Sequence, residues 1–206
     1  LVLENGKAVD LSAETEACAA MVVAGFGGEF GAKAIVETLA GDINPAGRLT
    51  VSYPRDEGMV PCYYTRLPGA SCDYLEGDRA PLYPFGHGLS YTKFAYSDLA
   101  LNPLGGTDCE VSFTVTNVGS RDGDEVVQVY INDPESSVVT PDKLLRKFKR
   151  MTLAAGESRK VTFTLGFDDL KLLGLDWQWK VEPGEFRVMV GASSEDIRLK
   201  GTIEIK

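Results

Sequence analysis

The sequence contains a single histidine, His87, and four cysteines, Cys18, Cys62, Cys72 and Cys109. With one histidine and no C-x-x-C spacing, the chain lacks the usual ligand set of a zinc site, and we expect no metal ion and no other cofactor. Four cysteines in 206 residues are also too few for a disulfide scaffold. We expect free thiols, although Cys62 and Cys72 flank one loop and could pair in an oxidising compartment.

Positive charge and long apolar runs are also scarce. The 21 Lys and Arg residues against 30 Asp and Glu residues give a formal net charge of −9. Phosphate binding needs a basic face, so we expect no nucleic-acid partner and no anionic-membrane partner. The longest apolar run, residues 17–24, is far short of the ~20 residues that a membrane helix requires. No Asn-x-Ser/Thr sequon occurs, so N-glycosylation is not implied.

The start of the chain carries no initiator Met, no basic segment and no small-residue cleavage site, so we expect no signal peptide in it. Residues 1–3 have the pattern of a strand already in progress, which predicts that the chain is a piece of a longer polypeptide. The sequence leaves the compartment open, and a periplasmic or secreted location is preferred to a cytoplasmic one.

Residues 1–55 have the pattern of a β-α unit. The continuous apolar run at residues 19–24 predicts a strand covered on both faces, as in a parallel sheet. A glycine-rich turn, residues 25–31, leads into a predicted helix over residues 29–40 that Gly41 ends. This turn has neither the Lys-Ser/Thr of a P-loop nor the dinucleotide spacing, so we do not expect it to bind phosphate.

Two shorter elements complete this region. Ser12 is the predicted N-cap of a short helix over residues 13–16, and residues 49–53 form a predicted strand that Pro54 ends. Three short strands and one proper helix within fewer than ~60 residues cannot bury an independent core. We therefore expect the packing partners of this unit to lie outside the sequence.

Residues 81–94 separate two differently patterned halves. Their prolines and glycines prevent a helix or a central strand from running through. The apolar side chains are too many for a solvated linker, so we predict a joint buried between two packed bodies. These side chains are Leu82, Tyr83, Phe85, Leu89, Tyr91 and Phe94. His87, within the joint, could be a proton shuttle, but a structural hydrogen-bonding role is the preferred interpretation.

Residues 56–80 form a predicted loop that is too long for a simple connection, and such loops are usually functional or disordered. Its tyrosines and charged residues suit a sugar site, while a solvated surface loop is the plainer interpretation. The positions that we select as candidate substrate-binding residues are Arg66, Asp73, Tyr74 and Asp78.

From residue 94 onward the apolar pattern has a period of two. Seven or eight short strands separated by turn signals predict an antiparallel, immunoglobulin-like β-sandwich. The candidate strands are residues 94–101, 109–117, 125–132, 144–153, 158–165, 177–181, 185–191 and 197–205. Val111, Phe113 and Val115 alternate with Ser112, Thr114 and Thr116, which predicts one core face and one wet face.

Two tryptophans fall in one of these strands. Trp177 and Trp179 are two residues apart, so a regular strand would place them on the same face. They could form a stacking platform for sugars, but core packing is the preferred interpretation because one face of every sandwich strand needs large apolar residues.

Candidate catalytic groups are missing. Glycoside hydrolysis needs two carboxyl groups held about 5–10 Å apart by a rigid scaffold, and no such pair can be nominated. Asp73, Glu76 and Asp78 share one loop, while the carboxylates at 168, 169, 195 and 196 fall in turns of the sandwich. A Ser-His-Asp arrangement could use only His87, and no serine sits in a nucleophile elbow. We therefore predict no catalytic residue within this chain.

Several motifs resemble those of glycoside hydrolase family 3. Residues 81–94 (Pro-Leu-Tyr-Pro-Phe-Gly-His-Gly-Leu-Ser-Tyr-Thr-Lys-Phe) resemble the segment that links the α/β sandwich domain of this family to its fibronectin type III-like domain. Residues 41–49 are similar to the motif G-D-x-N-P-S-G-R-L-P, with Thr50 in place of its last proline. Residues 2–9 resemble V-L-x-x-G-x-P-V, with Ala8 in place of proline, and residues 27–35 resemble P-G-E-E-G-G-x-A-I, departing at positions 27, 30 and 32.

The resemblance continues into the second half of the chain. Residues 145–153 resemble the strand L-x-x-F-x-x-V-x-L, residues 179–186 the turn W-x-V-E-P-G-x-Y/F, and residues 191–198 the motif G-x-S-S-x-D-I-R. The fold class that follows is an incomplete α/β sandwich followed by an all-β, fibronectin type III-like sandwich. The predicted domains are residues 1–80, the joint at residues 81–94, and residues 95–206.

In family 3 the nucleophilic aspartate lies on a preceding TIM-like barrel, and the acid/base carboxylate lies upstream of where this sequence starts. The resemblance therefore implies the C-terminal part of a retaining β-glucosidase or β-xylosidase, with an oligosaccharide as substrate of the intact enzyme. The barrel and the rest of the α/β sandwich domain are its implied partners. Glu29 matches a motif glutamate at a helix entry and not the acid/base. The alternative is a self-sufficient, non-catalytic module that binds carbohydrate or protein.

Overall fold

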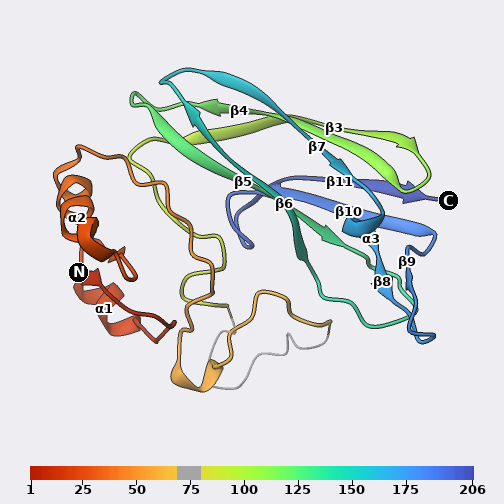
Figure 1. The fold of residues 1–206 in the computed structure, drawn as a ribbon, viewed down its shortest axis with the longest axis horizontal. Helices are drawn as coiled ribbons and strands as arrows, with labels where there is room; N and C mark the ends of the chain where they lie inside the picture. Colours follow the sequence, from red (N-terminus) through yellow and green to blue (C-terminus); the bar gives the residue numbers. More distant parts are fainter. Residues whose placement is uncertain (69–79) are drawn as a thin grey trace.

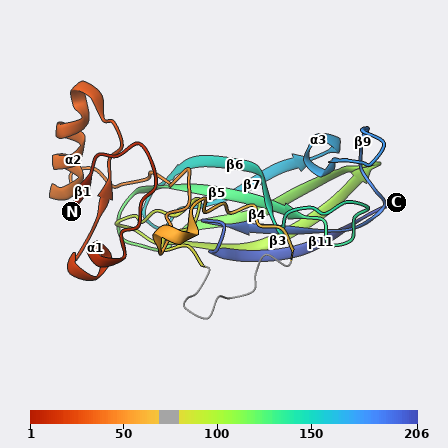
Figure 2. The same cartoon turned by 90° about the horizontal axis from the view of Figure 1, so that it is seen from below.

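The computed structural model describes residues 1–68 and 80–206 (Figure 1). The N-terminal part contains β1 (Val2–Leu3), α1 (Ser12–Ala17), β2 (Val22–Val23), the 3-10 helix η1 (Gly28–Phe30) and α2 (Gly31–Ala40). A second 3-10 helix, η2 (Glu57–Met59), follows. Both views place α1 and α2 at one end of an elongated molecule and β9 at the other (Figures 1 and 2). Of the helices in the described residues, none combines the length and apolar character that crossing a membrane requires.

β1 and β2 pair in parallel, with Val2 opposite Val22 and Leu3 opposite Val23. This is the parallel pairing that the continuous apolar run predicted. The helix α2 ends at Gly41, as expected, because Gly41 adopts the left-handed conformation with φ 86°. The amide of Asp42 then donates to the carbonyl of Glu37 at 2.8 Å and satisfies the last turn of the helix.

Three expectations for the N-terminal part are corrected by the structure. Ser12 is not an N-cap: it is the first residue of α1, its hydroxyl donates to the carbonyl of Arg55 at 2.8 Å, and Leu11 occupies the cap position. Residues 49–53 do not form a strand. They lie along the proline-containing joint, and the only β-bridge between these two described segments joins Tyr53 to Tyr83. The strand at residues 19–24 shortens to β2, and it is not covered on both faces.

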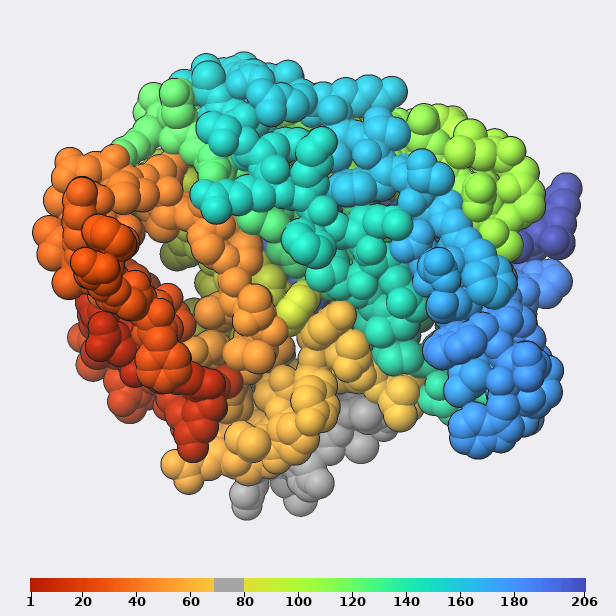
Figure 3. Space-filling model, in the orientation of Figure 1, coloured from red at the N-terminus to blue at the C-terminus, as the bar shows by residue number. Residues whose placement is uncertain are grey.

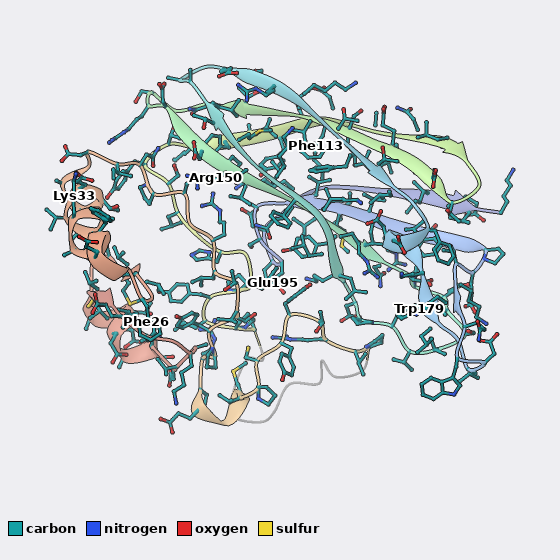
Figure 4. The ribbon with its side chains drawn as sticks, viewed as in Figure 1. Phe26, Lys33, Phe113, Arg150, Trp179 and Glu195 are labelled. Carbon is teal, nitrogen blue, oxygen red and sulfur yellow. The ribbon has the colours of Figure 1, made fainter. Side chains whose placement is uncertain are left out.

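The apolar surface of the N-terminal part is largely open. Val23 on β2 is exposed, as are Val36 and Leu39 on α2, and Phe26 in the glycine-rich turn is 85% exposed. Figure 4 shows Phe26 in the N-terminal part, away from the sandwich. Side chains of this size are normally buried, so the exposed faces are those that the missing neighbours of a β-α unit would cover.

The sandwich comprises two antiparallel sheets. One has the strand order β11-β10-β5-β6 and the other the order β3-β4-β7. The strands are β3 (Phe94–Gly105), β4 (Asp108–Asn117), β5 (Gly123–Asn132), β6 (Leu144–Leu153), β7 (Ser158–Leu165), β10 (Gly184–Gly191) and β11 (Ile197–Ile205). The short helix α3 (Phe167–Leu170) and the hairpin of β8 (Leu172–Leu173) and β9 (Trp179–Lys180) lie between β7 and β10. The predicted immunoglobulin-like sandwich is therefore confirmed.

The sandwich core lies between the two sheets. Val111, Phe113 and Val115 of β4 are fully buried, as their alternation predicted, and Figure 4 shows Phe113 between the sheets. They pack with Val127 and Val129 of β5 in one continuous apolar cluster. Truncating a buried phenylalanine to alanine typically costs about 3–5 kcal/mol, so this cluster alone can hold the two sheets together.

The outer face of β4 is drier than expected. Ser112 is buried and its hydroxyl has no hydrogen-bond partner among the described residues, while Thr114 and Thr116 are half-buried. The reason is that β4 is the central strand of its sheet, so its neighbours β3 and β7 shield a side chain as small as serine.

The tryptophan hairpin also differs from the prediction. Residues 177–181 are not one strand, since only Trp179–Lys180 form β9. Trp177 lies in the tight turn before it with a positive φ of 59°, so the two indoles do not share a regular strand face. Trp177 is 79% exposed and Trp179 is 57% exposed. The interpretation that they pack in the core is wrong.

We predict that residues 95–206 fold on their own and that residues 1–80 do not, because only the sandwich closes its own core. Limited proteolysis of the chain should leave a stable fragment that starts near the joint at residues 81–94. Equal protection of residues 1–60 would contradict the prediction, unless another chain supplies the missing sheet neighbours.

Candidate functional site

The structure describes only one of the four candidate substrate-binding residues, Arg66. Asp73, Tyr74 and Asp78 lie outside the described residues, and so does Cys72. Arg66 is described: its carbonyl accepts a hydrogen bond from the amide of Asp142 at 2.8 Å. The structure thus places Arg66 against the segment that precedes β6, and the grouping of all four residues stays a prediction.

The side chain of Arg66 has a local partner in Cys62. Burial raises the pKa of the Cys62 thiol, and the neighbouring Arg66 guanidinium acts in the opposite direction. Cys62 is a free thiol, as are Cys18 and Cys109. The described cysteines therefore agree with the preferred interpretation of free thiols.

Tyr64 fastens the described part of the loop to the sandwich. Its ring stacks on Phe85 with centroids 4.2 Å apart and meets Tyr130 of β5 edge-on at 6.1 Å. Its hydroxyl accepts a hydrogen bond from the amide of Leu145 on β6 at 3.2 Å. Around Tyr64 the loop is thus a packed connection, and the interpretation as a solvated surface loop does not hold there.

A buried ion pair joins the N-terminal part to the sandwich. Arg48 Nη2 lies 3.2 Å from Glu125 Oε1 on β5, and the two side chains are 8% and 3% exposed. The same carboxylate oxygen accepts the amide of Val126 at 3.0 Å, and Arg48 Nη1 donates to the carbonyl of Gly47 at 3.0 Å. Removing either partner would leave the other charge buried and unpaired, which is strongly destabilising.

Gln128 forms a second link beside this ion pair. Its amide nitrogen donates to the carbonyls of Ala192 at 2.6 Å and Gly86 at 3.3 Å, and its oxygen accepts from the Tyr130 hydroxyl at 2.5 Å. A Cβ at Gly86 would lie 2.2 Å from Gln128 Oε1, and Gly86 has a positive φ of 82°. Glycine is thus required at this position both by conformation and by space.

Asn44 forms a third link. Its side-chain oxygen accepts from the Ser90 hydroxyl at 2.9 Å and from the amide of Tyr91 at 2.8 Å, while its nitrogen donates to the carbonyl of Asp122 at 2.9 Å. One amide group therefore joins the turn after α2, the joint and the loop before β5. The Arg121 guanidinium adds a hydrogen bond to the carbonyl of Gly41.

His87 has a structural role in the joint. Its carbonyl accepts the amide of Leu49 at 2.8 Å, and its ring stacks on Tyr83 with centroids 5.3 Å apart. Burial lowers the pKa of His87, and the nearby Arg48 cation lowers it further. The imidazole is therefore neutral at pH 7, since both burial and the Arg48 cation disfavour its protonation.

The predicted burial of the joint is only partly met by its apolar residues. Leu82, Tyr83, Phe85 and Phe94 are half-buried. Leu89 and Tyr91 are exposed, which corrects the prediction for these two residues. Tyr91 is held by its hydroxyl, which donates to the carbonyl of Thr38 at 2.8 Å.

The carboxylates that fall in turns of the sandwich are engaged in ion pairs. The pairs are Asp168 with Lys171 at 2.6 Å, Asp169 with Lys147 at 2.9 Å, Glu195 with Lys143 at 3.3 Å and Asp196 with Arg198 at 2.7 Å. Glu29 lies in η1, at the entry to α2. Within residues 1–68 and 80–206, no group of three or more His, Cys, Asp or Glu side chains could hold a metal ion.

Comparison with known families accounts for this arrangement. Residues 1–91 match the family described as "Glycosyl hydrolase family 3 C-terminal domain", and residues 125–194 match "Fibronectin type III-like domain". The chain belongs to glycoside hydrolase family 3. The motifs of this family in residues 41–49 and 81–94 are therefore the segments that join the two parts.

Relatives within family 3 are much longer than this chain. A "Beta-xylosidase" from Formosa agariphila is 42% identical over 97% of this chain and 29% of its own length. A "Periplasmic beta-glucosidase" from Salmonella typhimurium is 36% identical over 100% of this chain and 28% of its own length. A crystal structure of a β-glucosidase from Listeria innocua in complex with glucose superposes with a TM-score of 0.94 at 32% identity, over 99% of this chain and 30% of that one. The chain thus spans less than a third of the length of these relatives.

Sequence reasoning missed the residues that join the two parts of this family 3 chain. No feature of residues 42–48 predicted a contact with the sandwich, whereas Asn44 donates to the carbonyl of Asp122 and Arg48 pairs with Glu125. Their partners Asp122 and Glu125 lie 78 and 77 residues further along the chain, so no local pattern pointed to them. The isolated charges within otherwise apolar β5 were the available signal.

The buried ion pair yields a prediction with a matched control. Arg48→Ala should lower the free energy of unfolding by about 3–5 kcal/mol, because it leaves Glu125 buried and unpaired. The control is Arg150→Ala, which breaks the ion pair between Arg150 of β6 and Asp124 of β5. The Arg150 side chain is 66% exposed, so its loss should cost at most about 1 kcal/mol. Urea unfolding measures both, and equal losses would contradict the prediction.

A pair of glycines gives a second prediction. A Cβ at Gly88 would lie 2.2 Å from the backbone carbonyl oxygen of Gly47, whereas a Cβ at Gly47 would meet nothing within 4 Å. Gly88→Ala should therefore destabilise the chain by about 1–3 kcal/mol, and Gly47→Ala should stay within about 0.5 kcal/mol. Thermal unfolding distinguishes the two, and a tolerated Gly88→Ala would show that the interface is not closely packed.

Proposed function

We propose that this chain is the C-terminal part of a retaining β-glycosidase that releases terminal β-linked glucose or xylose from oligosaccharides. The observation that carries the proposal is the similarity of the whole chain to family 3 proteins. Residues 1–91 and 125–194 match two family models in succession, and the relatives are named as β-xylosidases and β-glucosidases. The proposed role of these residues is architectural: they support a catalytic barrel and an α/β sandwich domain that the rest of the polypeptide supplies.

The chemistry supports an incomplete enzyme. A retaining glycosidase needs a nucleophilic carboxylate and an acid/base carboxyl about 5–5.5 Å apart. In the described residues, four carboxylates in turns of the sandwich form ion pairs with lysine or arginine, which is a structural use of these groups. The competing function, a self-sufficient binding module, is less well supported because the match to enzymes extends over the whole chain.

We further propose that the loop at residues 56–80 is the segment of this chain that approaches substrate in the intact enzyme. The support is its length, its tyrosines and charges, and the attachment of its described part to the sandwich through Tyr64 and Arg66. A loop anchored at its base can present its tip reproducibly, as binding loops on rigid scaffolds do.

The first test uses the 206-residue chain itself. We expect no turnover of nitrophenyl β-glucoside or β-xyloside, because the carboxylate pair is absent, while the longer polypeptide that carries the chain should turn over at least one of them. Activity of the purified chain that disappears on mutating one of its own carboxylates would overturn the architectural role. An inactive longer polypeptide would overturn the glycosidase proposal.

The loop is tested in the longer polypeptide. Alanine at Arg66, Asp73, Tyr74 or Asp78 should change KM or the aglycone preference more than it changes the free energy of unfolding, because we propose that these side chains contact the substrate. Lys200→Ala, an exposed change on β11, is the control and should change neither. If all four variants behaved like the control on several glycosides, the loop would have no role in substrate binding.

A further inference from the structure

A groove opens on the sandwich beside the β8–β9 hairpin. Its walls are residues 138–141 with Leu144 and Arg146 on one side, and residues 171–173 with Trp179 on the other. Its volume is about 390 Å³, which falls within the range of ~300–1,000 Å³ typical of small-ligand pockets. Figure 3 shows the blue residues of the hairpin next to the loop that precedes β6, at the end of the molecule opposite α2. We call this feature the Trp179 groove.

An aromatic platform lines the groove. Trp179 is 57% exposed although its side chain is large and apolar. The Lys171 ammonium lies 5.1 Å from the centroid of the Trp179 ring and donates to Asp168 at 2.6 Å. These contacts fix the position of the indole, which is still accessible to a ligand. Figure 4 shows Trp179 on the β8–β9 hairpin, away from Phe113 and the core. A rigid, exposed indole offers a flat apolar surface with little loss of conformational entropy on binding.

Arg146 lines both the groove and a small adjoining cavity, which Asp133 also lines. Arg146 Nε is buried and has no hydrogen-bond partner among the described residues, and neither has Asp133 Oδ2, on a small adjoining cavity of about 30 Å³ that Arg146 also lines. Burial raises the pKa of the Asp133 carboxyl. Buried polar atoms are nearly always satisfied, so this place offers an unpaired donor and an unpaired acceptor close to an apolar platform.

A ligand that fits this groove has a flat apolar face and polar groups that can accept a hydrogen bond. A pyranose ring has this combination: its C–H face stacks on an indole, and its hydroxyls can accept from Arg146. We propose that the Trp179 groove is a non-catalytic binding site for a β-linked pyranose chain, with Trp179 as the stacking platform and Arg146 as the hydrogen-bonding partner. This inference rests on the proposed function, because it gives the proposed glycosidase a second site at which it binds a polymeric substrate.

The hairpin provides a matched control. Trp177 is more exposed than Trp179 but does not line the groove. Trp179→Ala removes the platform, Arg146→Gln replaces the guanidinium with a shorter, neutral amide, and Trp177→Ala removes an equally large side chain from the same hairpin. Trp177 and Trp179 are exposed, so neither change should disturb the fold, and thermal unfolding verifies that each variant is native.

The experiment is affinity electrophoresis of the longer polypeptide in gels that contain soluble xylan or mixed-linkage β-glucan, together with kinetics on a nitrophenyl glycoside. The unmutated protein should be retarded by at least one polysaccharide. Trp179→Ala should raise the dissociation constant about tenfold or more, since it removes a central aromatic contact, and Arg146→Gln should raise it to a smaller extent. Trp177→Ala should be retarded as the unmutated protein is, and kcat/KM on the nitrophenyl glycoside should be unchanged in all three variants.

The outcomes separate the two proposals. If the protein hydrolyses the nitrophenyl glycoside but neither polysaccharide retards it, the groove proposal is wrong and the glycosidase proposal stands. Equal loss of retardation in Trp177→Ala and Trp179→Ala would also overturn the groove. A large drop in thermal stability of Trp179→Ala in the longer polypeptide would mean that another part of the protein fills the groove. Retardation without hydrolysis of any glycoside would contradict the glycosidase proposal and favour a binding module.

Discussion

The buried pair of Arg48 and Glu125 is the contact on which the arrangement of the two parts depends. Two charges are removed from water there, and the desolvation cost offsets most of their attraction. The pair therefore adds little net stability, but any other placement of the N-terminal part would leave one charge buried alone. Asn44 and Gln128 act in the same way, because each satisfies backbone groups of several segments at once. We infer that this polar interface fixes orientation, while the apolar sandwich core supplies stability.

This division agrees with the architectural role proposed for the chain. The sandwich has its core between two sheets, and it contacts the N-terminal part through Glu125 and Asp122. The N-terminal part is anchored on the sandwich at one end and leaves the apolar sides of α2 and β2 open at the other. Longer relatives in family 3 have the length to cover those sides. In this account the sandwich fixes the orientation of the N-terminal part.

Local patterns predicted what depends on local chemistry. The bounds of β6, β7 and β11 follow from alternation and flanking turn residues, and the structure has them at the predicted residues. The end of α2 at Gly41 follows from the freedom of glycine to adopt positive φ. Contacts between distant residues were beyond such reasoning: Glu125 faces Arg48 across 77 positions, and Trp177 leaves its strand because the hairpin turn requires a positive φ there. The candidate residues Asp73, Tyr74 and Asp78 lie outside the described part, so only Arg66 could be placed.

Hydrogen exchange of individual amides in the 206-residue chain tests the central claim most directly. The amides of Asp142 and Ser194 in the sandwich donate across the interface, to the carbonyls of Arg66 and Phe85. If the interface fixes the N-terminal part on the sandwich, these amides should be protected nearly as well as that of Val127 in the core strand β5, while amides of α2 exchange much faster. Exchange of Asp142 and Ser194 at the rate of α2 would contradict the account, because the two parts would then separate freely.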